Sequence, residues 1–490
     1  MSKAMNETVT VYELPDGPRS DTETDSTRVV ELRPPSLDAP RPDVPARLES
    51  SRLEQPPHWI VVVGGGAGGL ELATRLGDRL GRRGRAEITL VDRARTHVWK
   101  PLLHEVAAGS LVLAENELSY PDQAHRHGFR YRVGEMIALD RRRKQVHLAA
   151  TFDDEGRVLI PPRAIGYDTL VIAIGSLTND FGTPGVAEHA VPLETPAHAA
   201  RFNRRLIDAC IRAQTQPGAI RPGQLHIAIV GAGATGTELA AELQRTAREL
   251  VSYGLDRIDP ERDIHIVLID AADRVLPGLP ERISGSTHRL LAEMGIEVRT
   301  GAKVIEVTAT GLKLADGSFV SSELVVWAAG VKGPPVLQDL DGLEVNRATQ
   351  LVVNPTLETT RDPNIFAIGD CAACPRPGMS TPVPPRAQAA HQQAAHMVRQ
   401  IERRMSGKHL LPYAYMDFGS LVSLGRWSTV GNLMGPLFGR GLFIEGFFAR
   451  LMYRFLRLIH ERALHGTVRA AFGAGARALS RRTGPPVKLH

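Results

Sequence analysis

The feature that most constrains this chain is a glycine pattern that occurs twice, each time directly after a run of apolar residues. In the first copy, Ile60 to Val63 have the composition of a short, buried parallel strand. Three glycines follow in the spacing G-x-G-x-x-G, namely Gly64, Gly66 and Gly69. The first permits a tight turn, the second lets the backbone approach a pyrophosphate, and the third lets a helix pack against the strand. The pattern therefore predicts a loop that binds the phosphates of a dinucleotide.

The residues after this loop complete a strand–helix–strand unit. The helix that starts at this loop points its N-terminal amides and positive dipole end at the phosphates. Ile88 to Val91 form the second strand, and Asp92 at its end can accept a hydrogen bond from a ribose hydroxyl. A glycine pattern alone is weak evidence, but the complete unit with its terminal acid is specific.

The chain then repeats the unit. Ile227 to Glu242 follow the first copy almost letter for letter, and the strand Ile266 to Asp270 again ends in an aspartate. Later strands are also related, because LVIAIG at Leu170 to Gly175 resembles LVVWAAG at Leu324 to Gly330. The glycines of the second loop are Gly231, Gly233 and Gly236. Two such units predict an α/β chain with two Rossmann-like domains and two dinucleotides face to face, the architecture of a flavoprotein that takes hydride from a nicotinamide.

Two acids in the second unit bear on its ligand. Asp270 favours the free 2′-hydroxyl of NADH over the 2′-phosphate of NADPH, although Arg274 nearby weakens that preference. Glu238 lies in the first turn of the helix after the loop. Its carboxylate either faces the nicotinamide or the flavin ring, or it is an acid favoured by the helix dipole.

Composition limits the compartment. The 490 residues suffice for two or three domains, and three cysteines are too few for a disulfide framework, so we expect a reducing compartment. The N-terminus lacks an apolar signal segment, which argues against secretion. No stretch of about eighteen uncharged apolar residues occurs, so we expect no membrane-spanning helix.

The C-terminal segment is strongly basic. Residues 437–490 hold ten lysines or arginines against Glu445 and Glu461, which gives +8, whereas the other residues sum to −3. Arg450, Arg454 and Arg457 lie on one helical stripe, with large apolar residues around the remainder. This pattern predicts a basic amphipathic helix that binds a membrane surface, with packing on the protein body as the alternative. Nucleic acid is disfavoured, because no reading element is visible.

Other polar residues are candidate contacts. Lys100 and His104 follow the first unit and can touch flavin or substrate, while Asp370 ends a buried strand and can bind flavin ribityl or a hydroxyl. Cys371 and Cys374 form a C-x-x-C pair, but without a second pair they predict neither a zinc site nor, on spacing alone, a redox site; no metal is expected.

A helix is predicted from Pro384 to His396. Gln388, His391 and Gln392 fall at i, i+3 and i+4 and so share one face. Amides and an imidazole suit the carbonyls of a flat polar head group, but spacing alone favours an ordinary solvated face.

Several segments together resemble the type II NADH:quinone oxidoreductases, single-subunit respiratory enzymes of bacterial membranes. The likeness runs from about His58 to His490. Besides both glycine loops, it rests on HVWKPLLHEVAAGSL, LVVWAAG, FAIGDCAACPRP, VPPRAQAAHQ and DFGSLVSLG. The segments around Pro101 and Gln388 are far more specific than the loops, which many flavoenzymes share.

The resemblance implies FAD in the first unit, NADH in the second, and a quinone site lined by Gln388 and Gln392, with ubiquinone or menaquinone as the acceptor. It also implies that Ala328 to Gly330 back the flavin ring. The implied FAD contacts are Gly64, Gly66, Ala67, Gly69, Asp92, Lys100, Gly175, Ala329, Asp370 and Gln388. The implied NADH contacts are Gly231, Gly233, Gly236, Glu238, Asp270 and Gly330. The candidate catalytic residues are Glu238, Gln388 and Gln392.

The same resemblance implies a peripheral homodimer on the cytoplasmic side of the inner membrane, held on the bilayer surface through residues 437–482, and no proton pumping. The rival interpretations are a soluble flavin NADH:electron-carrier reductase, disfavoured by the missing cysteine pair after the first loop, and a flavin and NADH sensor without turnover. The expected domains are a disordered tail (1–56), an FAD domain in two parts (57–180 and 331–405), an NADH domain (181–330) and a membrane-associating region (406–490).

Overall fold

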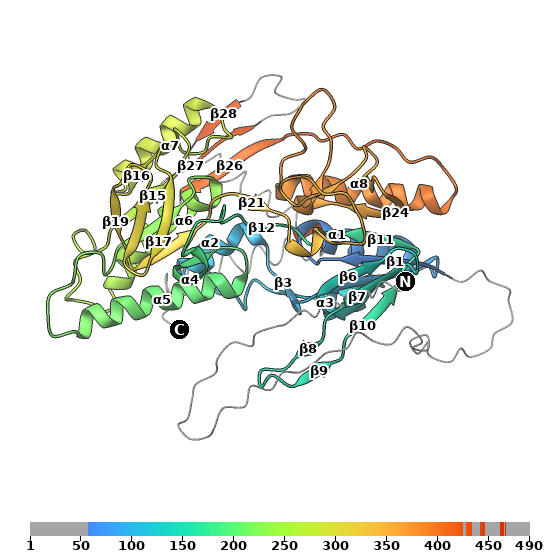
Figure 1. The fold of residues 1–490 in the computed structure, drawn as a ribbon, viewed down its shortest axis with the longest axis horizontal. Helices are drawn as coiled ribbons and strands as arrows, with labels where there is room; N and C mark the ends of the chain where they lie inside the picture. The colour runs from blue at the N-terminus through green and yellow to red at the C-terminus, as the bar shows by residue number, and fades with distance from the viewer. Residues whose placement is uncertain (1–56, 425–427, 434–441, 446–460, 465, 467–490) are drawn as a thin grey trace, which may run out of the picture. The chain divides into compact units, whose positions relative to one another are not determined.

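The computed structural model describes residues 57–424, 428–433, 442–445, 461–464 and 466 (Figure 1). The predicted disordered tail and most of the predicted amphipathic helix lie outside the described residues. Of the segment whose pattern predicts that helix, Leu442–Glu445 form a strand instead, and residues 461–464 are helical.

The first sheet is assembled from two separated stretches of the chain. Its strand order is β23-β24-β11-β1-β2-β5, and all neighbours are parallel except the β23–β24 pair at one edge. The central strands are buried because they are almost continuously apolar. The bounds are β1 His58–Val63, β2 Ala86–Asp92, β5 Arg130–Val133, β11 Thr169–Ile172, β23 Glu358–Thr359 and β24 Asp362–Ala367.

The second sheet is built from one continuous stretch and is entirely parallel, in the order β13-β20-β14-β15-β16. Its central strands are the predicted repeats of β1, β2 and β11, so the predicted α/β fold with two related units is confirmed. The bounds are β13 Ala190–Pro192, β14 Ile227–Val230, β15 Ile266–Ile269, β16 Glu297–Arg299 and β20 Leu324–Trp327.

A two-stranded ribbon marks where the second unit leaves and rejoins the first. β12 (Leu177–Thr178) pairs antiparallel with β21 (Val331–Lys332), so the outgoing and returning segments lie against each other. The second unit is thus an insertion between two strands of the first sheet, β11 and β24.

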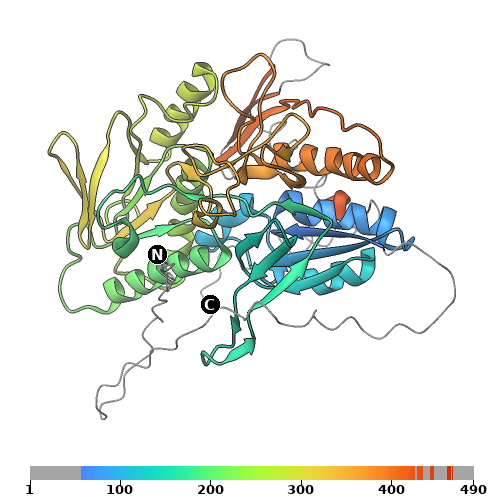
Figure 2. The same cartoon turned by 45° about the vertical axis from the view of Figure 1, so that its right-hand side comes forward.

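Each unit carries a small antiparallel sheet. β6 (Met136–Asp140), β7 (Gln145–Leu148) and β10 (Arg163–Gly166) form the first, whereas β17 (Val304–Thr308), β18 (Gly311–Leu314) and β19 (Phe319–Ser321) form the second. From the sequence, the short apolar runs Phe129 to Val133 and Val158 to Ile160 are predicted to be strands of the first of these sheets, and both assignments to that sheet are wrong. Phe129 to Val133 corresponds to β5, which joins the main sheet, and β9 (Val158–Ile160) pairs with β8 (Thr151–Phe152) in a separate hairpin arm (Figure 2).

Helices cover the two sheets. α1 (Ala67–Leu76) follows the first glycine loop and packs along α8 (Ala387–Met405), where Gly68 approaches Ala390 closely enough that a Cβ would lie 3.2 Å from its carbonyl oxygen. The sequence from Pro196 to Ile211 predicts a helix, and α5 (Pro196–Thr215) confirms it. The Thr195 side chain caps this helix by accepting a hydrogen bond from the His198 N–H. The other helices are α2 Leu103–Ala107, α3 Tyr120–His127, α4 Val186–His189, α6 Ala234–Val251 and α7 Glu281–Glu293.

Short elements complete the two units. They are the π-helical turn η1 Gly77–Gly81, the 3-10 turns η2 Lys100–Leu102, η3 Pro335–Leu337 and η4 Gly369–Cys371, and the strands β3 Thr96–His97, β4 Leu118–Ser119, β22 Leu351–Val352 and β25 Ala372–Ala373.

A third antiparallel sheet follows α8. Its strands are β26 (Gly419–Leu424), β27 (Ser428–Leu433) and β28 (Leu442–Glu445). The sequence from Tyr413 to Gly425 is strand-like, but the strand begins only at Gly419, because the preceding residues run irregularly along α8. No helix among the described residues is long and apolar enough to cross a membrane.

Candidate dinucleotide and quinone sites

The first glycine loop has the shape of a phosphate cradle. Gly64 has φ +101°, and a Cβ there would lie 2.4 Å from the Ala173 carbonyl oxygen. A Cβ at Gly69 would lie 1.8 Å from the carbonyl oxygen of Gly64, so α1 packs directly on the turn. Gly66 is different, because nothing lies within 4 Å of its would-be Cβ. The loop is closed on its inner side and open at the glycine where a pyrophosphate would approach, so its residues fit a dinucleotide.

The second loop repeats this geometry. Gly231 has φ +109°, and a Cβ at Gly236 would lie 1.9 Å from the carbonyl oxygen of Gly231. Gly233 again has nothing within 4 Å. The two loops thus place the same open glycine before the N-terminus of a helix, and both fit a pyrophosphate.

The two strand-end acids are turned toward their own loops. Asp92 accepts hydrogen bonds from the N–H groups of Gly65 (2.6 Å) and Ala94 (2.8 Å). Asp270 accepts them from Ala232 (2.5 Å) and Ala272 (2.8 Å). Each carboxylate oxygen keeps a second lone pair, so a ribose hydroxyl can still donate to it. Burial raises the pKa of Asp92, and the two backbone N–H groups oppose that rise.

Arg274 is held by its own loop. Its guanidinium donates to the carbonyl oxygens of Pro277 (3.2 Å) and Leu279 (3.5 Å). In this arrangement the guanidinium is engaged on backbone rather than on Asp270.

Three of the residues predicted to bind FAD, Lys100, Gly175 and Asp370, come together where the turn at Gly175 lies beside the end of β24. Lys100 Nζ donates to the carbonyl oxygen of Ser176 (3.2 Å), and Ser176 Oγ donates to Asp370 Oδ2 (3.0 Å). Gly175 forms the turn with φ +74°. Burial raises the pKa of Asp370, whereas Lys100 and Ser176 oppose that rise. The cluster can present one cation and one anion side by side to a polar cofactor.

Glu238 lies between elements of three parts of the chain. Its Oε2 is 3.5 Å from His104 Nδ1 of α2, and its Oε1 accepts a hydrogen bond from the Ser423 N–H of β26 (3.0 Å). Both side chains of the pair are almost fully buried. Burial raises the pKa of Glu238, while His104 and the Ser423 N–H oppose the rise. Glu238 is thus a buried acid with specific partners rather than one favoured by the helix dipole alone.

Gln388 and Gln392 hold the irregular segment after α8. Gln392 exchanges two hydrogen bonds with the Met416 backbone, at 2.7 Å and 3.0 Å. Gln388 donates to the Gly419 carbonyl oxygen (3.0 Å) and to Asp417 Oδ1 (3.3 Å), and accepts from the Phe418 N–H (3.3 Å). We refer to residues 416–419 as the clamped segment.

His391 contacts a different part of the protein from the two glutamines. Its Nδ1 lies 2.6 Å from Oε2 of Glu71, a fully buried acid of α1. Arg75 Nη2 lies 2.6 Å from the other oxygen of Glu71, at ion-pair distance. His391 therefore joins α8 to α1, and the glutamines join α8 to the clamped segment.

Ala329 and Gly330 follow the end of β20. Gly330 has φ +64°, and a Cβ there would lie 2.5 Å from the Phe181 ring. Its carbonyl oxygen accepts a hydrogen bond from the Asn179 N–H (3.4 Å), so the turn is held against the outgoing strand of the ribbon.

The C-x-x-C cysteines are free, buried thiols. Cys371 Sγ lies 3.3 Å from the carbonyl oxygen of Ile368, and burial raises the pKa of Cys371 and of Cys374 to about 12. Neither thiol is poised as a thiolate. Within the described ranges, no three His, Cys, Asp or Glu side chains gather as metal ligands.

Sequence reasoning missed two side chains beneath the first loop. His97 Nδ1 and the Tyr120 hydroxyl both lie within hydrogen-bond distance of the Gly65 carbonyl oxygen, at 2.9 Å and 2.8 Å. His97 begins the segment HVWKPLLHEVAAGSL, but nothing in that segment indicates a contact with the glycine loop, and Tyr120 belongs to none of the recognised motifs.

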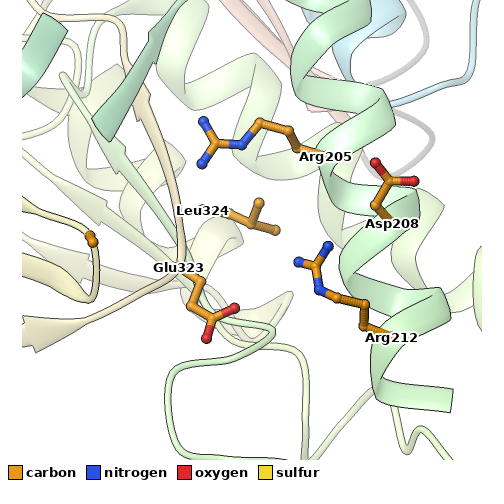
Figure 3. A pocket seen from close by; sticks show the side chains of 6 residues that line it. Arg205, Asp208, Arg212, Glu323 and Leu324 are labelled. Atoms are coloured by element: carbon orange, nitrogen blue, oxygen red, sulfur yellow. The ribbon is translucent and has the colours of Figure 1, made fainter. Parts of the chain in front are cut away.

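A polar cavity of about 320 Å³ lies away from both loops (Figure 3). Arg205, Asp208 and Arg212 of α5 line it on one side, opposite Glu323 and Leu324, and of these three side chains the two arginines extend toward the opposite side. Leu324 begins β20 and pairs with the first residue of the parallel strand β14, whereas the glycine loop follows the last residue of β14. The cavity is therefore at the end of the sheet opposite to the nucleotide loop, where such sheets do not bind their dinucleotides.

Comparisons with known proteins agree with this geometry. The family described as pyridine nucleotide-disulphide oxidoreductase matches residues 58–394. The type II NADH:quinone oxidoreductase of Haemophilus influenzae is 42% identical over 443 residues, covering 88% of this chain and 99% of that relative. NdhA of Mycobacterium tuberculosis, also named a type II NADH:quinone oxidoreductase, is 29% identical over 87% of this chain and 88% of its own length. The solved structure of NDH2 from Plasmodium falciparum in complex with NADH has the same fold, with a TM-score of 0.73 at 20% identity, covering 88% of this chain and 100% of that one.

Proposed function

This chain belongs to the pyridine nucleotide-disulphide oxidoreductase family and, within it, to the type II NADH:quinone oxidoreductases, and we propose that it oxidises NADH with a membrane quinone without pumping protons. It is an FAD-dependent enzyme, and FAD held by the first loop would supply the two-electron redox chemistry that links oxidation of NADH to reduction of the quinone, whose two protons would come from the protein or solvent. The observation that carries the proposal is the pair of equivalent open glycine loops, each with a strand-end acid beside it.

The first loop is the proposed FAD site. Asp92 offers its free lone pairs to the adenosine ribose, and the open face of Gly66 admits the pyrophosphate. Lys100 and Asp370 supply a cation and an anion where β24 ends. Gly64, Ala67, Gly69, Gly175, Ala329 and Gln388 are proposed to complete the FAD site.

The second loop is the proposed NADH site. Asp270 selects the free 2′-hydroxyl, and this selection is supported by the engagement of Arg274 on its own loop. Gly231, Gly233, Gly236, Glu238 and Gly330 are proposed to complete it. The domain limits given above, with the FAD domain split around the NADH domain, are part of this proposal.

Glu238 is the proposed local proton donor. A buried carboxyl with a raised pKa holds a proton near neutral pH more readily than an exposed one, and His104 beside it can receive or return that proton. Gln388 and Gln392 are proposed to line the quinone site at the clamped segment, where amide groups lie next to exposed Met416 and Phe418.

The membrane part of the proposal rests on the resemblance and on charge. We propose a peripheral homodimer on the cytoplasmic side of the inner membrane. The basic residues 437–482 would attract anionic lipid head groups, and the large apolar side chains among them would enter the interface.

The decisive experiment measures NADH oxidation by the FAD-loaded protein with and without a short-chain ubiquinone or menaquinone. It is run beside the double variant Gln388→Ala/Gln392→Ala and the control Glu402→Gln, which changes a residue of α8 that pairs with Arg79 away from the clamped segment. We expect quinone-dependent turnover in the parent and the control. In the double variant, quinone turnover should fall at least tenfold while NADH still reduces the flavin.

Either of two results would contradict the proposal. If NADH reduces the flavin but quinone leaves turnover unchanged in the parent, a soluble electron-carrier reductase or a sensor takes its place. If the double variant keeps full quinone turnover, the quinone does not use this helix. Reconstitution in vesicles with an internal pH dye tests the non-pumping part, because turnover should leave the internal pH unchanged.

A further inference from the structure

Two buried side chains lie within hydrogen-bond distance of the carbonyl oxygen of Gly65. The Tyr120 hydroxyl of α3 donates to it at 2.8 Å, and His97 Nδ1 of β3 lies 2.9 Å away. A carbonyl oxygen only accepts hydrogen bonds, so His97 must carry a proton on Nδ1 in this arrangement. Tyr120 and His97 are 3% and 6% exposed, so water does not compete for either bond.

The N–H of the same residue is fixed as well. It donates to Asp92 Oδ2 at 2.6 Å. A side chain at this position is excluded, because a Cβ would lie 2.4 Å from the Tyr120 hydroxyl oxygen. Gly65 is therefore held in place by three side chains, from the end of β2, from β3 and from α3.

Fixing this carbonyl also orients the next amide. The Gly65 carbonyl and the Gly66 N–H belong to one planar trans peptide, in which C=O and N–H point in opposite directions. Since the carbonyl points toward Tyr120 and His97, the Gly66 N–H points away from them. Nothing lies within 4 Å of the position of a Cβ on Gly66. The two buried side chains thus aim a hydrogen-bond donor at the place where a pyrophosphate would lie.

The second loop is held by other groups. There the equivalent carbonyl, that of Ala232, accepts a hydrogen bond from the Leu276 N–H at 2.8 Å and lies 3.4 Å from Thr237 Oγ1. Leu276 has φ +50°, a backbone conformation that is costly for leucine. The two loops share their glycines and their acid, but only the first is held by a tyrosine and a histidine.

We propose that Tyr120 and His97 are positioning residues that set how tightly the chain retains FAD, and that they leave NADH binding unaffected. The inference rests on the proposed function, because it assigns FAD to the first loop. A resident cofactor needs a rigid cradle, since every degree of freedom lost on binding weakens retention. The first loop is made rigid before FAD arrives.

Removing one of the two bonds leaves the other in place. We therefore expect Tyr120→Phe and His97→Leu each to raise the FAD dissociation constant about two- to tenfold. The double variant leaves a buried carbonyl without any partner, so its effect should exceed the product of the single effects.

The experiment removes FAD from the full-length protein and titrates it back, following the quenching of flavin fluorescence. Tyr167→Phe is the matched control, since Tyr167 is a buried tyrosine of the same core whose hydroxyl has no hydrogen-bond partner. His97→Asn is the rescue variant, because an asparagine amide nitrogen can take the place of Nδ1 as a donor. The Michaelis constant for NADH is measured at saturating FAD.

We expect weaker FAD binding in Tyr120→Phe and His97→Leu, near-parental binding in Tyr167→Phe and His97→Asn, and an NADH Michaelis constant within about twofold of the parent throughout. Unchanged FAD binding in the first two variants would overturn the inference, as would an equal loss in Tyr167→Phe or a parallel weakening of NADH binding. A parent protein that binds no FAD would overturn the proposed function itself, which separates the two failures.

Discussion

Glu238 Oε2 lies 3.5 Å from His104 Nδ1, and both side chains are buried where α6, α2 and β26 meet. An acid and an imidazole placed together away from water are suited to proton exchange, but a buried carboxylate is costly to keep ionised. Burial accordingly raises the pKa of Glu238. This arrangement predicts that the ionisable carboxyl of Glu238 lowers the stability of the protein but is needed for its activity.

We expect Glu238→Gln to stabilise the protein increasingly as pH rises. A carboxyl whose folded-state pKa lies above its unfolded-state value stabilises the fold below the unfolded value, and that contribution is lost as pH rises through the folded value. Glutamine keeps an acceptor for the Ser423 N–H and does not ionise. The melting temperature of the variant minus that of the parent should therefore grow from about pH 5 to pH 8. Scanning calorimetry at several pH values measures it, and a difference that shrinks as pH rises would refute the expectation.

The same substitution should slow quinone reduction. If Glu238 supplies a proton, its loss costs about 10²- to 10⁴-fold in that step. Stopped-flow reduction of the flavin by NADH serves as the internal control and should change far less. If flavin reduction by NADH slows as much as quinone reduction does, Glu238 instead acts at the nicotinamide.

Substituting the open glycine of one loop should weaken the binding of one nucleotide without affecting the other. Gly66 and Gly233 have φ values of −65° and −73° and free space around them, so alanine should fold at either position without strain. Its methyl group would occupy the space that a pyrophosphate needs. We expect Gly66→Ala to weaken FAD binding, and Gly233→Ala to weaken NADH binding with FAD retained, each by roughly 5- to 150-fold. Flavin content and NADH titration measure the two effects.

Breaking the contact between His391 and Glu71 should destabilise the FAD-loaded protein. Glu71 is fully buried and His391 Nδ1 lies 2.6 Å from it, so His391→Leu leaves a buried carboxylate with Arg75 alone. The expected loss is about 1–3 kcal/mol in urea unfolding. Arg79→Ala is the control, because the more exposed Arg79–Glu402 pair should contribute under about 1 kcal/mol. Equal losses in the two variants would show that burial of Glu71 is immaterial.

The cysteines should be inert in the native protein. Burial raises the pKa of Cys371 and Cys374 to about 12 and that of Cys210 to about 11, so very little thiolate exists at pH 8. Intact mass after iodoacetamide should show no adduct in native protein and three in urea, matching the three cysteines of the chain. Rapid alkylation of the native protein with loss of turnover would reopen a redox role for the pair.

The parts of the site that follow from sequence are those whose chemistry is local. The glycine spacing, the apolar strand before it and the acid after the next strand all lie within one βαβ unit, so Gly66 and Asp92 were recognisable without a fold. Tyr120 was not, because it reaches Gly65 across 55 positions, and a single tyrosine carries no pattern. The same holds for Ser423, which meets Glu238 across 185 positions.

Helical spacing located α8 but not its contacts. Residues at i, i+3 and i+4 span an arc of about 100° around a helix. That arc is wide enough for Gln392 to reach the clamped segment while His391 reaches Glu71 on α1. The strand β5 was misplaced for a related reason, since its partner is chosen by the path of α3 back to the sheet and not by its own residues.

The insertion of the second unit between β11 and β24 also orders events during synthesis. Strand β24 pairs with β11 only after some 190 intervening residues have been made, so the first sheet has high contact order and stays incomplete until late. The second sheet lies wholly within that interval and can close on its own. The proposed NADH unit can therefore fold before the ribosome has made β24. The proposed FAD unit cannot complete its sheet until β24 has been made.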